Sequence, residues 1–282
     1  MSTGRERRIE ERDRSRERRA EEREQSRERR LEEREARRHR GEPQPPIWTR
    51  PEPGARRARL TREDIARAAL QIADADGIDA LSMRRVASEL GVGTMSLYYY
   101  VQTKAELLDL MHDEMIGEVV VPDGELPDDW RGALETIARR ALEATRRHPW
   151  ALDSPPTAAG PNGMRHFEQS LAAVADLDIH EQTRFDIILI VDEYVFGYAL
   201  REAAEQREAQ AWDEAHLEAM LQYFESLLAS GQFPHVDSLR QGQDARASFD
   251  RIQGLLRDPG RFERGLKRLL DGIALELGDA AR

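Results

Sequence analysis

The pattern of hydrophobic and polar positions between residues 61 and 101 predicts three short helices. Apolar side chains recur at helical spacing from Ile65 to Ala73 and again from Val86 to Leu90, which gives each segment one side to bury. Leu97 and Val101 lie four positions apart and give a third segment, from residue 94 onward, its inward face. The pattern therefore predicts three packed helices within about forty residues.

Local capping signals mark where these helices begin and end. Thr61 and Asp64 have the spacing of a capping box at the start of the first helix, and Gly77 follows its end. Ser82 is suited to cap the second helix. Gly91 is suited to the left-handed residue that ends it. Two helices joined by this tight glycine turn predict a helix-turn-helix.

The third helix carries side chains that need a partner outside the domain. The tyrosines at positions 98–100 could belong to the core or to a protein interface. A place in the core is disfavoured, because Leu97 and Val101 already occupy the inward positions. Exposed tyrosines and small polar residues are typical of a DNA-recognition helix, where rings contact thymine methyls and hydroxyls reach phosphates or base edges. The positions expected to face outward or sideways are Thr94, Met95, Ser96, Tyr98, Tyr99 and Tyr100.

The stretch LTREDIARAALQIADADGIDALSMRRVASELGVGTMSLYYYVQTKAELLDLM resembles the DNA-binding domain of the tetracycline repressor (TetR) family. The motifs that carry the resemblance are Leu90-Gly91-Val92, the pair Leu97-Tyr98, and Lys104, all in register. Many members have histidine where this chain has Tyr100. By position, the resemblance implies DNA contacts from Ser82, Met83, Arg84, Thr94, Met95, Ser96, Tyr98, Tyr99, Tyr100 and Lys104.

The rest of the chain has the 3.6-residue periodicity of amphipathic helices. We expect helices over residues 104–118, 130–148, 163–175, 181–204, 213–229 and 262–277. The helix over 181–204 has apolar residues on two sides, and a partner subunit best explains how both are covered. This region resembles the tetracycline-repressor type of C-terminal domain, which implies a homodimer built from the long apolar helix and the last helix.

An apolar effector pocket is expected among the helices over 104–118, 130–148, 163–175 and 181–204. Methionines and aromatic residues adapt to ligands of varied shape, although each is more often ordinary core. Val120 stands where the tetracycline repressor has a ligand histidine, so a magnesium–tetracycline chelate is not expected. Asp192 could help to orient a ligand. The candidate lining residues are Met111, His112, Met115, Trp130, Met164, Phe167 and Tyr194.

Residues 1–40 form a charged tail and residues 41–55 a proline-rich linker. The tail repeats with a period of 11, as GRERRIEERDR, SRERRAEEREQ and SRERRLEEREA, with one apolar residue in each copy. It holds 16 arginines against 12 acidic residues, so it is about +4, while the whole chain is −11. A solvated charged helix, weak attraction to DNA phosphates and self-association remain alternatives. The prolines predict an extended linker. Three arginines, Arg56, Arg57 and Arg59, lie between this linker and the first predicted helix.

Composition excludes several other classes of function. The chain has no cysteine, which suits a reducing cytoplasm and excludes a disulfide framework. The seven histidines show no metal-binding spacing, and no cofactor or enzyme motif is present. The longest aliphatic run, residues 187–191, is far shorter than the ~20 residues of a membrane span. We therefore expect no metal, no cofactor, no catalysis and no membrane insertion.

These observations predict an all-α protein with a three-helix helix-turn-helix DNA-binding domain over 56–104. It is joined to a larger helical ligand-binding and dimerisation domain over 105–282. The expected function is a homodimeric transcriptional regulator, a repressor that binds a palindromic double-stranded DNA operator and is released by a small apolar effector. The alternative is an architectural or scaffold DNA-binding protein without an inducer, and ligand-insensitive DNA affinity would favour it.

Overall fold

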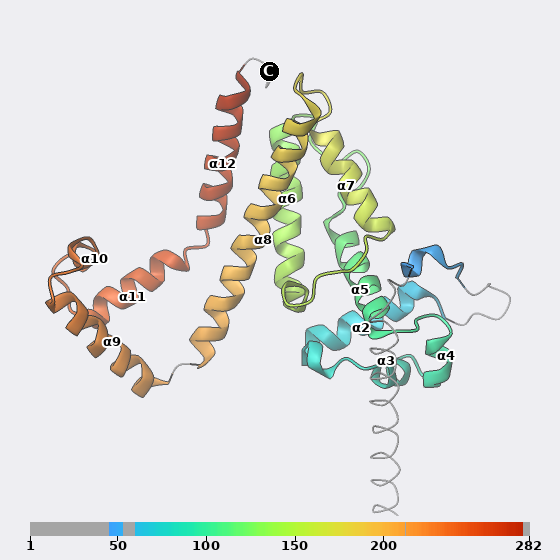
Figure 1. Cartoon of the computed structure of the whole chain (residues 1–282), viewed down its shortest axis with the longest axis horizontal. Helices are drawn as coiled ribbons and strands as arrows, with labels where there is room; N and C mark the ends of the chain where they lie inside the picture. The colour runs from blue at the N-terminus through green and yellow to red at the C-terminus, as the bar shows by residue number, and fades with distance from the viewer. Residues whose placement is uncertain (1–44, 53–59, 212, 279–282) are drawn as a thin grey trace, which may run out of the picture. The chain divides into compact units, whose positions relative to one another are not determined.

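A computed structural model describes residues 45–52, 60–211 and 213–278, and their secondary structure is entirely helical. The chain divides into two compact units (Figure 1). Among the described residues, one unit contains 45–72, 80–111 and 156–158, and the other contains 73–79, 112–155 and the residues from 159 onward. The predicted all-α fold class is confirmed. Helix α5 (Lys104–Val119) is continuous through the boundary at 111.

The first unit contains the predicted helix-turn-helix. Its helices are α2 (Arg62–Asp76, up to Ile72), α3 (Met83–Glu89) and α4 (Thr94–Tyr98). The capping box forms as predicted, because the Thr61 amide donates to the Asp64 carboxylate at 3.0 Å and the Asp64 amide donates to the Thr61 hydroxyl at 3.1 Å. Gly91 has a φ of +65° and ends α3.

Complete burial of a few apolar side chains holds this unit together. Ile65, Val86, Leu97 and Val101 are all 0% exposed, as the hydrophobic pattern predicted. At ~25 cal/mol per Å² of buried apolar surface, such side chains contribute most of the stability of so small a domain. The backbone that carries α4 is therefore fixed by packing on its inward side.

Part of the predicted linker is also buried. Residues Ile47–Thr49 form a single 3-10 turn, and Ile47 is 0% exposed. The Arg50 guanidinium donates to the Glu106 carboxylate at 2.6 Å, and Arg62 donates to the Arg50 carbonyl at 3.1 Å. The prediction of an extended linker is wrong for residues 47–49, because the apolar side chain of Ile47 gains more from burial than the proline-rich chain gains from extension.

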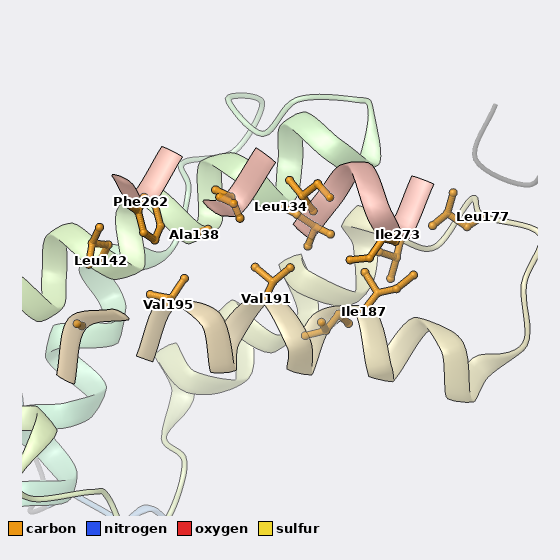
Figure 2. Close-up of a cluster of buried hydrophobic side chains, with 14 of the residues drawn as sticks. Leu134, Ala138, Leu142, Leu177, Ile187, Val191, Val195, Phe262 and Ile273 are labelled. Carbon is orange, nitrogen blue, oxygen red and sulfur yellow. The ribbon is translucent and has the colours of Figure 1, made fainter. Parts of the chain in front are cut away.

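The second unit is a helical assembly around one apolar core. Its helices after α5 are α6 (Trp130–Arg147), α7 (Pro161–Ala173), α8 (Glu181–Ala211), α9 (Glu214–Ala229), α10 (Pro234–Ser238), α11 (Ala245–Leu256) and α12 (Arg261–Leu277), with short 3-10 turns at Ile78–Ala80 and Pro149–Leu152. Figure 2 shows side chains of α6, α8 and α12 meeting in the core. Leu134, Val191 and Leu270 are each at most 1% exposed there.

Helix α8 is longer than predicted and apolar on two sides. Ile187, Ile188, Val191, Val195 and Ala199 are buried in the core of the unit. The opposite side presents a stripe of side chains that are each 42–52% exposed within the single chain: Phe185, Leu189, Phe196 and Leu200. We call these four residues the α8 stripe.

Helix α12 passes close to α8 at one glycine. The Tyr194 hydroxyl donates to the Phe262 carbonyl at 2.8 Å, and the two rings stack with centroids 5.4 Å apart. A side-chain carbon added at Gly265 would lie 2.8 Å from Cζ of Tyr194. Only glycine leaves room for the tyrosine ring in this arrangement.

The segment between α8 and α12 forms three helices, of which only α9 was predicted. Helices α9, α10 and α11 pack against one another (Figure 1). Asp213 caps α9 by accepting from the His216 amide at 2.8 Å, and Asp244 caps α11 by accepting from the Ala247 amide at 2.8 Å. Helix α11 was missed although Phe249, Ile252 and Leu256 recur at helical spacing, and α10 has only five residues, too few for a periodic pattern.

Truncation of Leu270 should destabilise the second unit strongly. Its side chain is 0% exposed in the core, so Leu270→Ala leaves a cavity and lowers the free energy of unfolding by roughly 2–5 kcal/mol. Leu275 lies on the same helix and is 85% exposed, so Leu275→Ala should change it by less than about 0.5 kcal/mol. Urea unfolding followed by circular dichroism measures both. Equal effects of the two variants would contradict the placement of α12.

Candidate DNA-binding surface and effector unit

Helix α4 presents the outward surface that the sequence predicted, with one exception. Met95 is 81% exposed and Tyr99 is 72% exposed. Ser96 is exposed, and Thr94 and Tyr98 are half-buried. These side chains surround a helix whose inward positions are fully buried. A helix presented in this way is able to enter the major groove of DNA.

Tyr100 is the exception, and the prediction that it faces outward is wrong. Its side chain is only 9% exposed, because helical bonding continues past Tyr98, with the Val101 amide donating to the Leu97 carbonyl at 3.0 Å. Three positions after Leu97, Tyr100 therefore lies on the same inward face as Leu97 and Val101. The rings of Tyr99 and Tyr100 meet edge to face with centroids 5.8 Å apart. Tyr100 therefore supports the exposed ring of Tyr99 from inside the domain.

The other predicted contacts divide between surface and core. Lys104 is exposed at the first position of α5, and Arg84 is half-buried on α3. The Ser82 hydroxyl accepts from the Arg85 amide at 3.2 Å and caps α3. Met83 is 4% exposed, so it does not offer its side chain to DNA. As the first residue of α3 it turns toward the buried side of the helix.

Sequence reasoning missed Glu106, which stabilises the turn between α4 and α5. This buried carboxylate accepts from the Gln102 amide at 2.8 Å and from Arg50 at 2.6 Å. The Glu106 amide in turn donates to the Thr103 hydroxyl at 3.1 Å. The Thr-x-x-Glu spacing of a capping box at residues 103–106 is the signal that could have found it.

Two further acids of α5 hold neighbouring backbone segments. In the first unit, the Asp109 carboxylate accepts from the amide and the hydroxyl of Thr157, both at 2.7 Å. In the second unit, Asp113 accepts from the amides of Asn162 and Gly163 at 3.0 and 2.9 Å. Those amides belong to the first turn of α7, where a negative charge is favoured by the helix dipole. The available signal was the spacing of Asp109 and Asp113, which puts two acids four positions apart on one face of the helix together with apolar residues.

The carboxyl end of α5 is fixed as well. The Arg140 guanidinium of α6 donates to the carbonyls of Glu118, Val119 and Val120 at 2.7–2.9 Å. A cation that satisfies the last carbonyls of a helix also interacts favourably with its dipole. Within the second unit, α5 is therefore tied to α7 through Asp113 and to α6 through Arg140.

The predicted effector residue His112 belongs to a cluster of polar contacts. It is 5% exposed, its Nε2 contacts the Ser154 carbonyl, and its ring meets that of Trp150 with centroids 4.9 Å apart. Asp74 accepts from the Trp150 indole at 3.0 Å and lies 2.9 Å from Nδ1 of His148. These partners give His112 and its neighbours a structural role within the unit.

The structure distributes the other predicted effector residues over different surroundings. Met111 and Met115 are buried on α5, at 0% and 6% exposure, whereas Met164 and Phe167 are 59% and 38% exposed on α7. Trp130 and Tyr194 pack against the core of the second unit, and the Tyr194 hydroxyl is already bonded to Phe262. Tyr194 thus faces α12. That these residues together line one effector pocket remains a prediction.

Two titratable groups of the second unit, Asp192 and His166, are half-buried, and no hydrogen bond of their side chains is formed among the described residues. Burial raises the pKa of the Asp192 carboxyl on α8 to about 6. Burial also lowers the pKa of the His166 imidazole on α7, whose Nδ1 has no hydrogen-bond partner among the described residues. Polar groups of this kind are candidates to bind a polar atom of a ligand.

The described residues contain no cluster of three or more histidines and acids that could hold a metal ion. Within the same residues, no helix combines the length and the apolar character that crossing a membrane requires.

Comparison with known proteins gives a consistent result over most of the chain. The family model of bacterial regulatory proteins of the tetR family matches residues 65–111. The model of the tetracyclin repressor-like C-terminal domain matches residues 122–277. The first match covers the helix-turn-helix and the start of α5, and the second covers α6 to α12.

Individual relatives show the same similarity over both units. The HTH-type transcriptional repressor DrrR1 of Streptomyces coeruleorubidus is 40% identical over 224 residues, which cover 76% of this chain and 77% of DrrR1. An HTH-type transcriptional regulator of Saccharopolyspora erythraea is 32% identical over 212 residues, covering 73% and 86% of the two chains. The structure of the TetR family protein ActR from Streptomyces coelicolor in complex with actinorhodin superposes with a TM-score of 0.60 and 32% identity, covering 79% of this chain and 99% of ActR.

Adjacent tyrosines at the end of α4 should respond differently to truncation. Tyr99 is exposed, so Tyr99→Ala should lower operator affinity on the order of tenfold while the thermal midpoint stays unchanged. Tyr100 is buried, so Tyr100→Ala should instead lower stability by about 3 kcal/mol. Fluorescence anisotropy with labelled operator DNA and thermal unfolding separate the two effects. If Tyr99→Ala binds DNA as tightly as the wild type, this surface has been misassigned.

The raised pKa of Asp192 predicts a pH-dependent stability difference. The folded pKa of the Asp192 carboxyl, about 6, exceeds its ordinary value of 3.8. The protonated group is therefore compatible with the fold at low pH, and this contribution to stability is lost as the pH rises through about 6. Asp192→Asn should therefore raise the thermal midpoint at about pH 7.5, and the gain should shrink toward about pH 4. The exposed neighbour Glu193, changed to Gln, is the control. A gain that is the same at both pH values would rule out titration of Asp192 as the cause.

Proposed function

The chain belongs to the TetR family of bacterial regulatory proteins and is a DNA-binding transcriptional regulator, and from this premise we propose that it is a repressor released from its operator by a small molecule. The observation that carries the proposal is the outward face of α4. Met95 and Tyr99 are 81% and 72% exposed beside the fully buried Leu97 and Val101. Such a surface on a small fixed scaffold suits the major groove. A regulator of this kind acts in the cytoplasm, where it meets DNA.

The α8 stripe supports a homodimer. Four apolar side chains, each 42–52% exposed along one face of a helix that is already buried on its other side, form an apolar surface of the kind that a partner subunit covers. A two-fold dimer would carry two copies of α4. Two recognition helices fit successive major grooves about 34–36 Å apart, so the operator should be palindromic.

Helix α5 is the element through which an effector would act. It begins with Lys104 next to the DNA-binding helices and continues into the second unit. There Asp113 binds the first turn of α7, and Arg140 binds the last turn of α5. A ligand that moves α7 or α6 would therefore move α5, and with it the spacing of the recognition helices.

The similarity to ActR supports a small-molecule effector. ActR structures include complexes with actinorhodin and with (S)-DNPA, and the (S)-DNPA complex has 31% sequence identity to this chain and covers 78% of it. We propose that the effector of this chain binds among α5, α6, α7 and α8. Asp192 and His166, which are half-buried and form no side-chain hydrogen bond among the described residues, are the polar groups that we propose to orient it.

Operator binding in the presence of candidate effectors tests the proposal. DNase footprinting on the region upstream of the gene should show a palindromic site. Titration with actinorhodin, (S)-DNPA or tetracycline then identifies an effector as the compound that weakens binding by about 5- to 150-fold. The same compound should raise the thermal midpoint of the free protein. A compound that binds tightly and leaves operator affinity unchanged would contradict release, and would favour the architectural alternative.

Asp113→Ala is the matched variant for the coupling route. It removes the acceptor for the first turn of α7 without touching the surface of α4. We expect operator affinity without effector to stay within about threefold of the wild type, and the effector to weaken binding much less. Asp123→Ala removes the same charge from an exposed turn before α6 and should behave like the wild type. If the effector still releases the Asp113→Ala variant fully from the operator, the contact between α5 and α7 does not carry the coupling.

A charge in the α8 stripe should prevent dimer formation. Phe196 is 52% exposed in the single chain, so Phe196→Glu should fold, but a buried unpaired charge at the interface costs several kcal/mol. Light scattering should show a monomer, and operator affinity should fall together with dimerisation. Glu143→Lys changes a side chain that is 71% exposed on α6 and serves as the control. A Phe196→Glu dimer would place the interface on other helices.

A further inference from the structure

Helices α9, α10 and α11 enclose a cavity that the proposed repressor function does not use. Its volume is about 420 Å³, which lies within the range of small-molecule sites. Apolar side chains line most of it and come from all three helices and the turn after α10. They include Met220, Phe224 and Leu228 of α9, Val236 of α10, and Phe249 and Ile252 of α11.

Ser248 of α11 is a buried polar residue in this lining, which also contains Glu225, Arg240 and Gln253. It is 5% exposed, and its hydroxyl has no hydrogen-bond partner among the described residues. Other helical serines of this chain use theirs locally, since Ser170 donates to the His166 carbonyl at 3.0 Å and Ser226 to the Tyr223 carbonyl at 2.7 Å. An unsatisfied buried hydroxyl is costly. Its position at the cavity wall makes it available to a hydrogen-bonding atom of a ligand.

The lining also limits the charge of the ligand. Glu225 and Arg240 contribute the charged side chains of the cavity lining, and Arg240 lies 3.7 Å from its neighbour Asp237. The remaining lining offers a charged ligand little compensation for the loss of its water. The rings of Phe224 and Phe249 favour a flat aromatic molecule. One hydroxyl, amine or carbonyl group at an edge of that molecule would match Ser248.

We propose that α9–α11 forms a second small-molecule site, which binds a neutral aromatic compound with one hydrogen-bonding group. The site is separate from the effector region that we propose among α5, α6, α7 and α8. A small molecule is the occupant that the observations favour over a second copy of the chain. The cavity is open on the side where Phe224, Val236 and Leu239 are 45–49% exposed. A compact ligand can enter there and reach the buried hydroxyl of Ser248.

N-Phenyl-1-naphthylamine is a suitable probe, because it is neutral and aromatic, carries one N–H group and fluoresces in apolar surroundings. Titration of the full-length protein should show saturable binding. Ala245 lines the cavity, so Ala245→Trp should fill it and remove one bound probe per protomer. Ala247 lies on the same helix and is not among the lining residues, so Ala247→Trp should keep the wild-type stoichiometry. Circular dichroism checks that both variants fold.

A second variant tests the hydroxyl without filling the cavity. Ser248→Ala should weaken binding of 2-naphthol, measured by displacement of the probe, by up to roughly tenfold, because one hydrogen bond is lost. Binding of naphthalene, which has no polar group, should not weaken. This comparison remains informative if Ala245→Trp fails to fold.

Two results would overturn the inference. One is unchanged probe stoichiometry in Ala245→Trp together with equal effects of Ser248→Ala on 2-naphthol and naphthalene. The other is a wild-type protein that binds no probe at this site, combined with a weaker dimer in Ala245→Trp by light scattering, which would make the cavity an interface between copies of the chain.

Discussion

Helix α8 has apolar residues around most of its circumference, and a helix of this kind has to be covered on more than one side. Within one chain, α6, α7 and α12 cover the side that contains Ile187, Val191 and Val195. The α8 stripe on the opposite side stays open to solvent. Because exposed apolar surface of this extent is unfavourable, the packing of α8 connects the fold of the second unit to its assembly. The core in Figure 2 thus buries only one of the two apolar sides of α8.

Helix α5 is held in a different way, through charges and backbone groups. Glu106, Asp109 and Asp113 are each at most 8% exposed, and all three accept hydrogen bonds from backbone amides. Hydrogen bonds from a carboxylate to amides have a narrow range of favourable distances and angles. An apolar contact tolerates sliding more easily. Such bonds fix α5 to neighbouring segments within each of the two units.

The helix-turn-helix could be predicted because its signals are local. The capping box at Thr61 and Asp64, the cap at Ser82 and the periodic apolar residues each act within a few positions, and the structure confirms them. The prediction failed for the orientation of Tyr100, because it considered only the four-residue spacing of Leu97 and Val101, whereas a residue three positions after Leu97 lies on the same face.

The effector region was harder to predict, because a cavity depends on which helices pair and at what angle. Met164 and Trp130 both suit a pocket by residue type, yet one is 59% exposed and the other packs on the core. Helix α11 was missed although Phe249, Ile252 and Leu256 recur at helical spacing. Among the polar anchors of α5, Glu106 had a local signal, whereas the partners of Asp109 and Asp113 are about fifty residues away in the sequence.

The contact between Tyr194 and Gly265 restricts how this sequence can change over evolutionary time. A side chain at position 265 would overlap the tyrosine ring, so it becomes acceptable only after position 194 has become smaller. A smaller residue at 194 in turn gives up the hydrogen bond to the Phe262 carbonyl. A substitution at either position alone is therefore unfavourable. Among descendants that keep this pairing of α8 and α12, the two positions should vary together, and such covariation would record the pairing in sequences for which no structure exists.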